Sequence, residues 1–402
     1  MKKKLFGIVL SLADYKNFYN QNKKLFDELS NNFKEVYVIN VEQLKFRSNI
    51  KNIKNEKILP KNFICKNFSK SSEFLKYFHD KELIALQYLS KNPDYFKIFF
   101  LLKLAKIKNI IIMNLGNYGN KQTFSFNKKN LFAFRHFYLK GFYYLYRFLN
   151  LINIFPKVDI LFECKKDTIK AIKNGISQKF ERKFPYFRIS YFRKIVQINS
   201  VFYDHYLNYL KSKKEIKNQI LYIDVPFNHP DRVLREGYCD KKQEKFFYKK
   251  IHIFLNYLSK LYKYKIVIGL HPSTKNGEKK FKNFLISRES TIDQIKKSKI
   301  IVVTHSSLIP LAVLYKKKII SIHSILLGDY HNNLITKYQK SLYLESYNLD
   351  LDIKNFNKKE FDKKKIKNYF YQKKFIKNNI CSTPQKKSCN QIIEVIKKDF
   401  FS

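Results

Sequence analysis

Short apolar runs of strand length alternate along this chain with segments of helix length, and this alternation most constrains its fold. The first forty residues show an apolar run at 5–12, a periodic segment at 15–29 and a second run at 36–39. A strand, a helix and another strand in this order form a βαβ unit, whose two strands run parallel. Parallel sheets need helices on both faces, so the pattern predicts a doubly wound α/β structure.

The pattern then continues along the chain. In the first half we expect helices near 82–89 and 94–106, strands at 109–113 and 158–162, and a helix from 167. The second half restarts with a strand at 219–224. The further strands expected there are 265–270, 284–286, 300–303 and 319–322, and the helices are 241–262, 291–297 and 308–315. We therefore predict two Rossmann-like domains facing a cleft, 1–195 and 215–402, with the C-terminal helices in the second.

The net charge of +48 suggests nucleic acid or an anionic membrane surface as a partner. Nearly all of this charge is lysine, and the chain is also rich in Asn, Ile, Phe and Tyr and lacks Trp, which is typical of an A+T-rich coding sequence. Nucleic-acid readers depend on arginine, which is scarce here, so we do not expect a nucleic-acid partner. Anionic lipid headgroups need only positive charge near a surface, and they remain a candidate partner.

Five cysteines without a CxxC pair give no disulfide framework or zinc finger and favour a cytoplasmic protein. The long apolar stretch 131–155 contains Arg135, His136, Lys140 and Arg147, so it is not expected to cross a bilayer. On a helical wheel, a narrow stripe is formed by His136, Lys140, Arg147 and Asn150, and the rest of the surface is apolar. The stretch is either a largely buried helix or a helix lying in the plane of the inner membrane surface.

Polar residues follow three strands of the second half, namely Asp224, His271 and the cluster 304–307. Ligands of open parallel sheets bind outside the carboxyl ends of the strands. Ser306 and Ser307 come at the start of a helix with Pro310 in its first turn, where hydroxyls and unpaired N–H groups can bind phosphate. The alternative is that one of these serines is only a helix N-cap.

Three runs carry a resemblance to a known family. They are 221–226 (LYIDVP), 266–272 (IVIGLHP) and 300–307 (IIVVTHSS). They resemble the second domain of bacterial sialyltransferases and polysialyltransferases, which have the GT-B fold and use CMP-sialic acid. The similarity covers roughly 215–330. Capsule and teichoic-acid glycerophosphotransferases, which use CDP-glycerol, share a similar pattern.

The resemblance implies that His271 and Pro272 form the HP motif, with His271 at the CMP phosphate. It also implies that Ser306 and Ser307 bind the phosphate or the leaving group at the helix end. From their places after strands, we further expect Thr304 to bind the phosphate and Asp224 to border the nucleotide. No cofactor or metal is expected beyond the nucleotide-sugar co-substrate.

Two features depart from the family. The acidic motif that supplies the general base has no match in the first half, and Ser273 follows the HP pair where many relatives carry Arg. A base must take the acceptor proton in a direct, inverting displacement, and we predict Asp14 for this role, with Glu163 second. The pair Asp350 and Asp352 fits a metal-binding Asp-x-Asp pattern, but its place after the second-half unit makes coincidence the better interpretation.

The sequence thus predicts a glycosyltransferase that moves a sialic-acid-like sugar from a CMP donor to a surface polysaccharide, capsule or lipopolysaccharide acceptor. We expect it in the cytoplasm, peripheral on the inner membrane face. One alternative is a CDP-glycerol-type glycerophosphotransferase. The more distant alternative is a non-catalytic basic protein that binds nucleic acid or lipid by charge alone.

Overall fold

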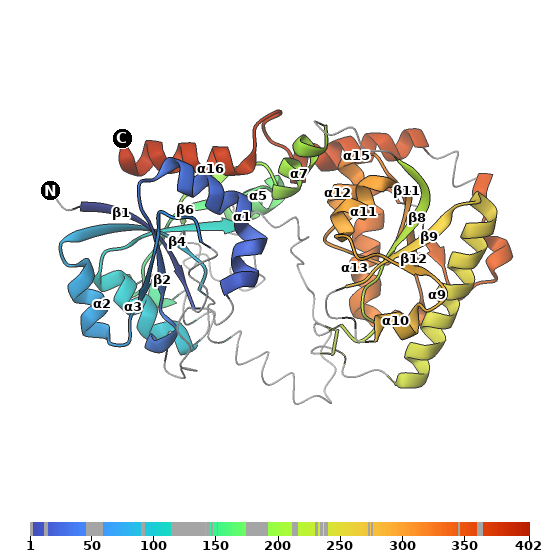
Figure 1. The fold of residues 1–402 in the computed structure, drawn as a ribbon, viewed down its shortest axis with the longest axis horizontal. Helices are drawn as coiled ribbons and strands as arrows, with labels where there is room; N and C mark the ends of the chain where they lie inside the picture. Colours follow the sequence, from blue (N-terminus) through green and yellow to red (C-terminus); the bar gives the residue numbers. More distant parts are fainter. Residues whose placement is uncertain are drawn as a thin grey trace. The chain divides into compact units, whose positions relative to one another are not determined.

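A computed structural model gives the fold (Figure 1). The residues it describes are 3–11, 15–45, 59–89, 93–113, 141, 145, 148–150, 152–173, 192–210, 216–229, 232–233, 236, 240–271, 274, 276–344, 346–359 and 365–402. These residues divide into two compact units. The first contains the described residues up to Val201 together with Ser382–Ser402, and the second runs from Phe202 to Cys381.

The first unit is built on a parallel sheet of seven strands in the order β3-β2-β1-β4-β5-β6-β7. Its strands are β1 (Lys3–Leu10), β2 (Val36–Asn40), β3 (Phe63–Asn67), β4 (Lys81–Gln87), β5 (Lys108–Met113), β6 (Val158–Glu163) and β7 (Phe192–Gln197). Its helices are α1 (Tyr15–Asn32), α2 (Ser71–Phe78), α3 (Phe96–Leu104), α5 (Lys166–Lys173) and α16 (Ser388–Ile396).

Alternate residues of β1 show why this sheet is covered on both faces. Leu5 and Val9 pack in one core with α2 and α3, while Phe6, Ile8 and Leu10 pack in another with α1 and α16. Successive strand side chains point to opposite faces, so an uninterrupted apolar strand requires a helical layer on each side. Figure 1 shows α1 and α16 along one face of the sheet and α2 and α3 on the other.

The second unit has six parallel strands in the order β10-β9-β8-β11-β12-β13. These strands are β8 (Lys217–Ile223), β9 (Lys265–Gly269), β10 (Leu285–Ile286), β11 (Ser298–Val303), β12 (Lys318–His323) and β13 (Ser346–Asn348). The helices are α7 (Val201–Leu210), which begins at the boundary, α9 (Lys241–Tyr262), α10 (Gly277–Lys280), α11 (Thr291–Lys297), α12 (Ile309–Leu314), α13 (Gly328–Leu342) and α15 (Lys365–Asn379).

The long helix α9 covers one face of this second sheet. Its Phe247, Ile251 and Leu258 pack against Ile220 and Tyr222 of β8. The other face packs against α7, α11, α12 and α15 (Figure 1). The predicted α/β class with two doubly wound parallel sheets is thereby confirmed.

Two expectations from the sequence differ from the structure. Residues 82–89 were expected to form a helix, but 81–87 are the strand β4, paired with β1 and β5 in the middle of the sheet. Leu, Ala and Gln favour a helix locally, but burial between two strands overrides that weak preference. The stretch 176–215 was expected to be irregular, yet β7 at 192–197 extends the first sheet and α7 follows it.

The C-terminal segment also departs from the predicted domain boundaries, which placed all of 215–402 in the second domain. Residues 382–402 belong to the first unit. The reason is the apolar face of α16, whose Ile392, Ile393 and Ile396 complete the core between α1 and the first sheet.

Asn199 fastens the segment that leads into α16. Its Oδ1 accepts hydrogen bonds from the backbone N of Ser382 at 2.7 Å and of Thr383 at 3.0 Å. Its Nδ2 donates to the carbonyls of Thr383 and Lys386, each at 2.6 Å, and its backbone N donates to Gln391 Oε1 at 2.7 Å. Asn199 is fully buried, so its loss would leave several backbone groups without a partner.

We predict that Asn199→Ala lowers the free energy of unfolding of the first unit by about 2–4 kcal/mol, because buried polar groups lose their partners. Amide hydrogen exchange in 382–402 should accelerate in parallel. Asn379→Ala is the matched control, since Asn379 makes one local bond, from Nδ2 to the carbonyl of Phe375. Unchanged exchange of 382–402 in Asn199→Ala would show that Asn199 does not hold this segment.

Candidate functional site

The second sheet reverses its strand order between β8 and β11, which lie side by side although β9 and β10 separate them in sequence. Because all strands are parallel, the residues that follow them gather at one edge of the sheet. Asp224 directly follows β8, and Thr304 directly follows β11. The crevice at such a reversal is where open α/β sheets bind their ligands.

Asp224 supports the turn that carries His271. Its backbone N donates to the carbonyl of Gly269 at 3.0 Å, and its Oδ2 accepts from the Thr274 hydroxyl at 2.6 Å. The backbone N of Thr274 in turn donates to the carbonyl of His271 at 2.8 Å, which closes the turn after β9. Burial raises the pKa of Asp224 to about 6. The residue expected to border the nucleotide is therefore a buried support of the loop that presents His271.

Four histidines converge beside this turn. The ring of His271 lies 5.4 Å from that of His229, in the loop after β8, and His229 lies 6.5 Å from His331 on α13. The rings of His331 and His305 are 4.6 Å apart, and His331 Nδ1 is 3.2 Å from His305 Nε2. We call these four residues the histidine cluster.

Burial lowers the pKa of three members of the histidine cluster, His271, His305 and His331, which favours their neutral form near pH 7. It lowers the pKa of His305 to about 3. Burial also holds the pKa of His331 well below its ordinary value, with neighbouring His305 and Arg232 adding to the effect. Neutral imidazoles can donate through one nitrogen and accept through the other, which suits a phosphate or hydroxyl ligand.

Arg232 ties the loop after β8 to the start of α13. Its guanidinium donates to the carbonyls of Phe227 and Leu326, both at 2.9 Å, and to Glu236 Oε2 at 3.1 Å. Gly328 has a φ of +69°, and a Cβ there would meet Glu236 Oε2 at 2.2 Å, so glycine is required. These contacts fix the distance between the loop carrying His229 and the helix turn carrying His331.

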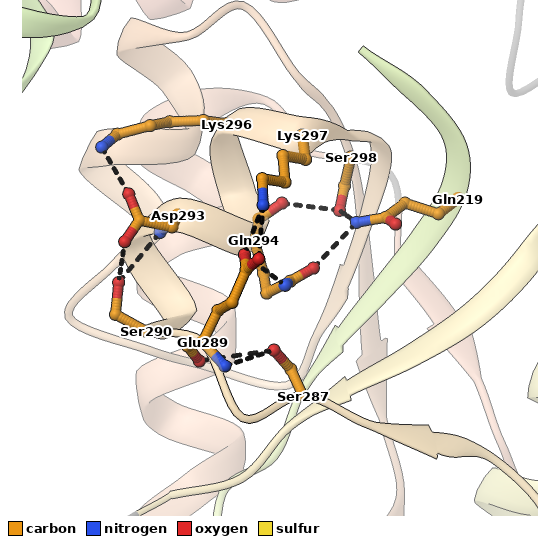
Figure 2. A network of polar contacts seen from close by, with 9 residues as sticks. All are labelled: Gln219, Ser287, Glu289, Ser290, Asp293, Gln294, Lys296, Lys297 and Ser298. Atoms are coloured by element: carbon orange, nitrogen blue, oxygen red, sulfur yellow. Dashed lines mark hydrogen bonds and ion pairs between the residues drawn. The ribbon is translucent and has the colours of Figure 1, made fainter. Parts of the chain in front are cut away.

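Polar side chains toward the amino ends of the same strands show a different arrangement (Figure 2). Gln219 Nε2 donates to Gln294 Oε1 at 2.9 Å and to Ser298 Oγ at 2.8 Å, and Ser298 Oγ donates to the carbonyl of Gln294 at 2.7 Å. Glu289 accepts from Gln294 and pairs with Lys297 at 2.5 Å. This network satisfies its own members and has the character of structural support.

The carboxyl edge instead holds buried polar atoms that make no hydrogen bond within the described part of the chain. They are Asp224 Oδ1, Thr304 Oγ1, His305 Nδ1 and His331 Nε2. An unsatisfied buried polar atom costs roughly 1–3 kcal/mol, so native proteins rarely keep several together without a reason. Their concentration at the strand reversal marks this edge as the candidate binding site.

The serines predicted to bind phosphate play a smaller role. Ser306 Oγ accepts from the backbone N of Leu308 at 3.2 Å, so it caps the turn before α12, and Ser307 is exposed. Pro310 lies in the first turn of α12 as predicted, but the helix has only six residues. Its dipole is correspondingly weak, and the alternative that Ser306 acts as a cap describes its contact here.

Of the two predicted bases, Asp14 lies outside the described residues, as does Pro272 of the HP pair. Glu163 ends β6 and is buried, and burial raises its pKa. Its Oε1 accepts from the backbone N of Lys165 at 2.9 Å, just before α5 begins. That contact is the kind a helix cap makes.

No individual role was predicted for three members of the histidine cluster, His229, His305 and His331, although His305 lies within the predicted polar cluster 304–307. His229 and His305 lie within runs that follow predicted strands, so their position at strand ends was a usable signal. His331 lies on α13, beyond the last predicted strand, and nothing local distinguishes it. Only the fold brings it to His305.

Within the described part of the chain, no three His, Cys, Asp or Glu side chains are arranged to hold a metal ion. Asp350 of the Asp-x-Asp pattern pairs with Lys250 at 2.6 Å and accepts from the backbone N of Ile325 at 2.7 Å. Asp352 accepts from the backbone N of Lys354 at 3.1 Å.

The helices that the structure describes include none long and apolar enough to cross a membrane. Most of the aromatic stretch 131–155 lies outside the described residues.

No protein-family model matches this chain, and no curated protein is similar to it in sequence. Solved structures are similar in fold. A protein assigned as a UDP-N-acetylglucosamine 2-epimerase of Listeria monocytogenes aligns with a TM-score of 0.51 and 10% identity over 100% of this chain and 97% of its own. A variant of the wall teichoic acid polymerase TagF soaked with CDPG aligns with a TM-score of 0.52 and 14% identity, over 99% and 89%. The fold is GT-B, as predicted.

We predict that Asp224→Asn changes how stability depends on pH. The pKa of Asp224 is raised from 3.8 to about 6 in the folded protein. Protonated Asp224 therefore favours folding, and this contribution is lost as the pH rises from about 4 through 6, by up to about 3 kcal/mol. Asparagine keeps an acceptor for Thr274 without ionising.

Urea unfolding of the second unit between pH 4 and pH 7.5 tests this prediction. The wild type should lose stability relative to Asp224→Asn across that interval, and the variant should be the more stable protein at pH 7.5. Parallel stability profiles for the two proteins would contradict an ionisation cost at Asp224.

Proposed function

We propose that this protein is a nucleotide-dependent transferase of the GT-B fold, with its nucleotide phosphate bound at the histidine cluster of the second unit. One observation carries the proposal. Four imidazoles and several unsatisfied buried polar atoms meet at the strand reversal of a doubly wound sheet. The similar solved structures are named for proteins that act on nucleotide sugars or build teichoic acid, which supports the same class.

For the donor we propose a cytidine nucleotide, either a CMP-linked sugar or CDP-glycerol. With a CMP-sugar, the acceptor oxygen attacks the anomeric carbon and CMP leaves. With CDP-glycerol, the acceptor oxygen attacks the outer phosphorus, glycerol phosphate is transferred and CMP again leaves. Because the fold is similar to that of TagF soaked with CDPG, we propose glycerol phosphate transfer on equal terms with sugar transfer.

In both reactions negative charge develops on the departing phosphate. Hydrogen-bond donors held in a site that excludes water stabilise such charge most effectively, because they need no reorganisation. In this proposal the hydrogen bonds to the phosphate come from His271, which the Asp224–Thr274 turn holds, and from the His305–His331 pair. Asp14 stays our proposal for the base that takes the acceptor proton.

Nucleotide binding tests the proposal directly. CMP or CDP at a hundred times its dissociation constant should stabilise the protein by roughly 2.7 kcal/mol, seen as a higher melting temperature, while ADP and GDP should not. His271→Ala should abolish the shift without changing the melting temperature of the free protein by more than a few degrees. His79→Ala is the matched control, since His79 is exposed and pairs with Asp80 in the first unit.

A shift with UDP or GDP alone would keep the binding site and overturn the cytidine donor. No shift with any nucleotide would favour the charge-only binding protein. Where CMP or CDP binds, incubation with CMP-sialic acid or CDP-glycerol and mass analysis of the product separates glycosyl transfer from glycerol phosphate transfer.

We also propose that the first unit docks on an anionic membrane, where a lipid-linked acceptor would lie. The surface is an apolar patch formed by α3 and the segment that packs on it through Phe155 and Phe96. Its partly exposed side chains are Phe100, Leu104, Phe148, Ile152 and Ile154, each between 39% and 51% exposed.

Charge around this patch is one-sided. Lys97, Lys103 and Lys106 lie on or next to α3, and the sequence has no Asp or Glu between Asp94 and Asp159. Exposed apolar side chains on a helix that also carries lysines suit the headgroup region of an anionic bilayer.

We predict that replacing Phe100 and Leu104 together by Glu weakens co-sedimentation with phosphatidylglycerol vesicles at least about tenfold, through lost apolar insertion and added negative charge. Leu285→Glu is the control, because Leu285 is 64% exposed on the second unit. Equal loss in both variants, or complete loss of wild-type binding in 0.5 M salt, would indicate binding by general charge without insertion at α3.

A further inference from the structure

The contact between His305 and His331 sets how many protons the pair can hold. A hydrogen bond between His331 Nδ1 and His305 Nε2 needs a proton on one of these nitrogens and a lone pair on the other. A neutral pair satisfies this condition. So does a pair with one added proton, because an imidazolium still donates to its neutral neighbour. Two added protons would put N–H groups on both facing nitrogens and break the bond.

The outer nitrogens of the pair show where an added proton would go. His305 Nδ1 and His331 Nε2 are buried and make no hydrogen bond of normal geometry within the described residues. The carbonyl of Phe227 nonetheless favours the protonated form of His331 slightly. In the neutral pair one outer nitrogen carries a hydrogen and the other a lone pair. With one added proton, both become donors.

The groups around the pair supply little net charge. His229 faces it from the loop after β8, and His271 lies beyond His229. The positive charge of Arg232 lowers the pKa of His331, but the guanidinium already forms an ion pair with Glu236.

On α13 itself, the ring of Tyr330 lies 5.2 Å from that of His331 and 6.5 Å from that of His305. Asp224 lies at the edge of the site, where it accepts from Thr274. A bound phosphate dianion would therefore meet the neutral His305–His331 pair and an arginine that already pairs with a carboxylate.

We propose that the site takes up one proton when a nucleotide phosphate binds, and that the His305–His331 pair holds this proton as the counter-charge of the phosphate. This inference rests on the proposed nucleotide site and adds the charge state in which the site works. The free pair resists protonation because burial and neighbouring imidazoles hold its pKa low. A buried phosphate dianion beside it reverses that preference.

Linkage fixes the sign of the pH effect. A site that binds a proton together with its ligand binds the ligand more tightly as the pH falls, through the interval between its free and its bound pKa. For uptake of one proton, affinity changes by up to tenfold per pH unit within that interval. A proton taken up by the phosphate of the bound nucleotide, in place of the histidine pair, would give a similar trend. The experiment must therefore distinguish these two sites of protonation.

Isothermal titration of the whole protein with CDP at pH 7.5, in Tris, HEPES and ACES, measures the uptake. Proton uptake makes the observed enthalpy depend on the ionisation enthalpy of the buffer, with a slope that gives the number of protons. We expect a slope that corresponds to uptake of between half a proton and one proton. His331→Gln and His305→Gln should each bring the slope near zero and weaken binding, while His79→Gln should leave both unchanged.

Each result decides between the proposals. Absence of binding of CDP, and of CMP in the same titration, would overturn the proposed cytidine nucleotide donor itself. Binding with a slope near zero would keep the nucleotide site and overturn proton uptake. A slope retained in both glutamine variants would assign the proton to the nucleotide or to another histidine, against the His305–His331 pair. The two variants differ in exposure, so one provides a folded test if the more buried His331→Gln fails to fold.

Discussion

The parallel direction of all six strands in the second sheet is the constraint on which the site depends. It brings the carboxyl end of every strand to one edge, and the reversal between β8 and β11 opens that edge between Asp224 and Thr304. Helices cover both faces of the sheet, so the side chains at this edge are buried by the layers beside them. Imidazoles placed there lose water, and that loss keeps them neutral and available to a ligand.

The two ends of the same strands carry polar side chains of different character. Near the amino ends, hydrogen bonds join the side chains of Gln219, Gln294 and Ser298. The ion pair between Glu289 and Lys297 completes this network. At the carboxyl ends, Asp224 and Thr304 each keep an atom without a partner in the described residues. The two ends of these strands thus differ in how far their buried polar atoms are satisfied by the described residues.

The sequence was most informative where a local pattern and the tertiary environment agree. The helix at 241–262 was predicted with the bounds of α9, since an Asp240 cap and a regular apolar face mark it. The strand β4 was missed because its leucines and alanine favour a helix until two neighbouring strands bury them. Within the site, His271 could be selected from its place after a strand. His331 could not, because its partner His305 is distant in sequence and meets it only through the packing of α13.

Because the C-terminal segment packs in the first unit, it determines when that unit can be completed during synthesis. Residues 382–402 follow the whole second unit in the sequence, yet α16 closes the core between α1 and the first sheet. During translation, the face formed by Phe6, Ile8 and Ile84 lacks its α16 layer, and has only α1 packed on it, until some two hundred residues after β7 have left the ribosome. The second unit has all of its own strands before that point. The half made first is therefore the half completed last, and its open apolar face is the surface that a chaperone would have to protect.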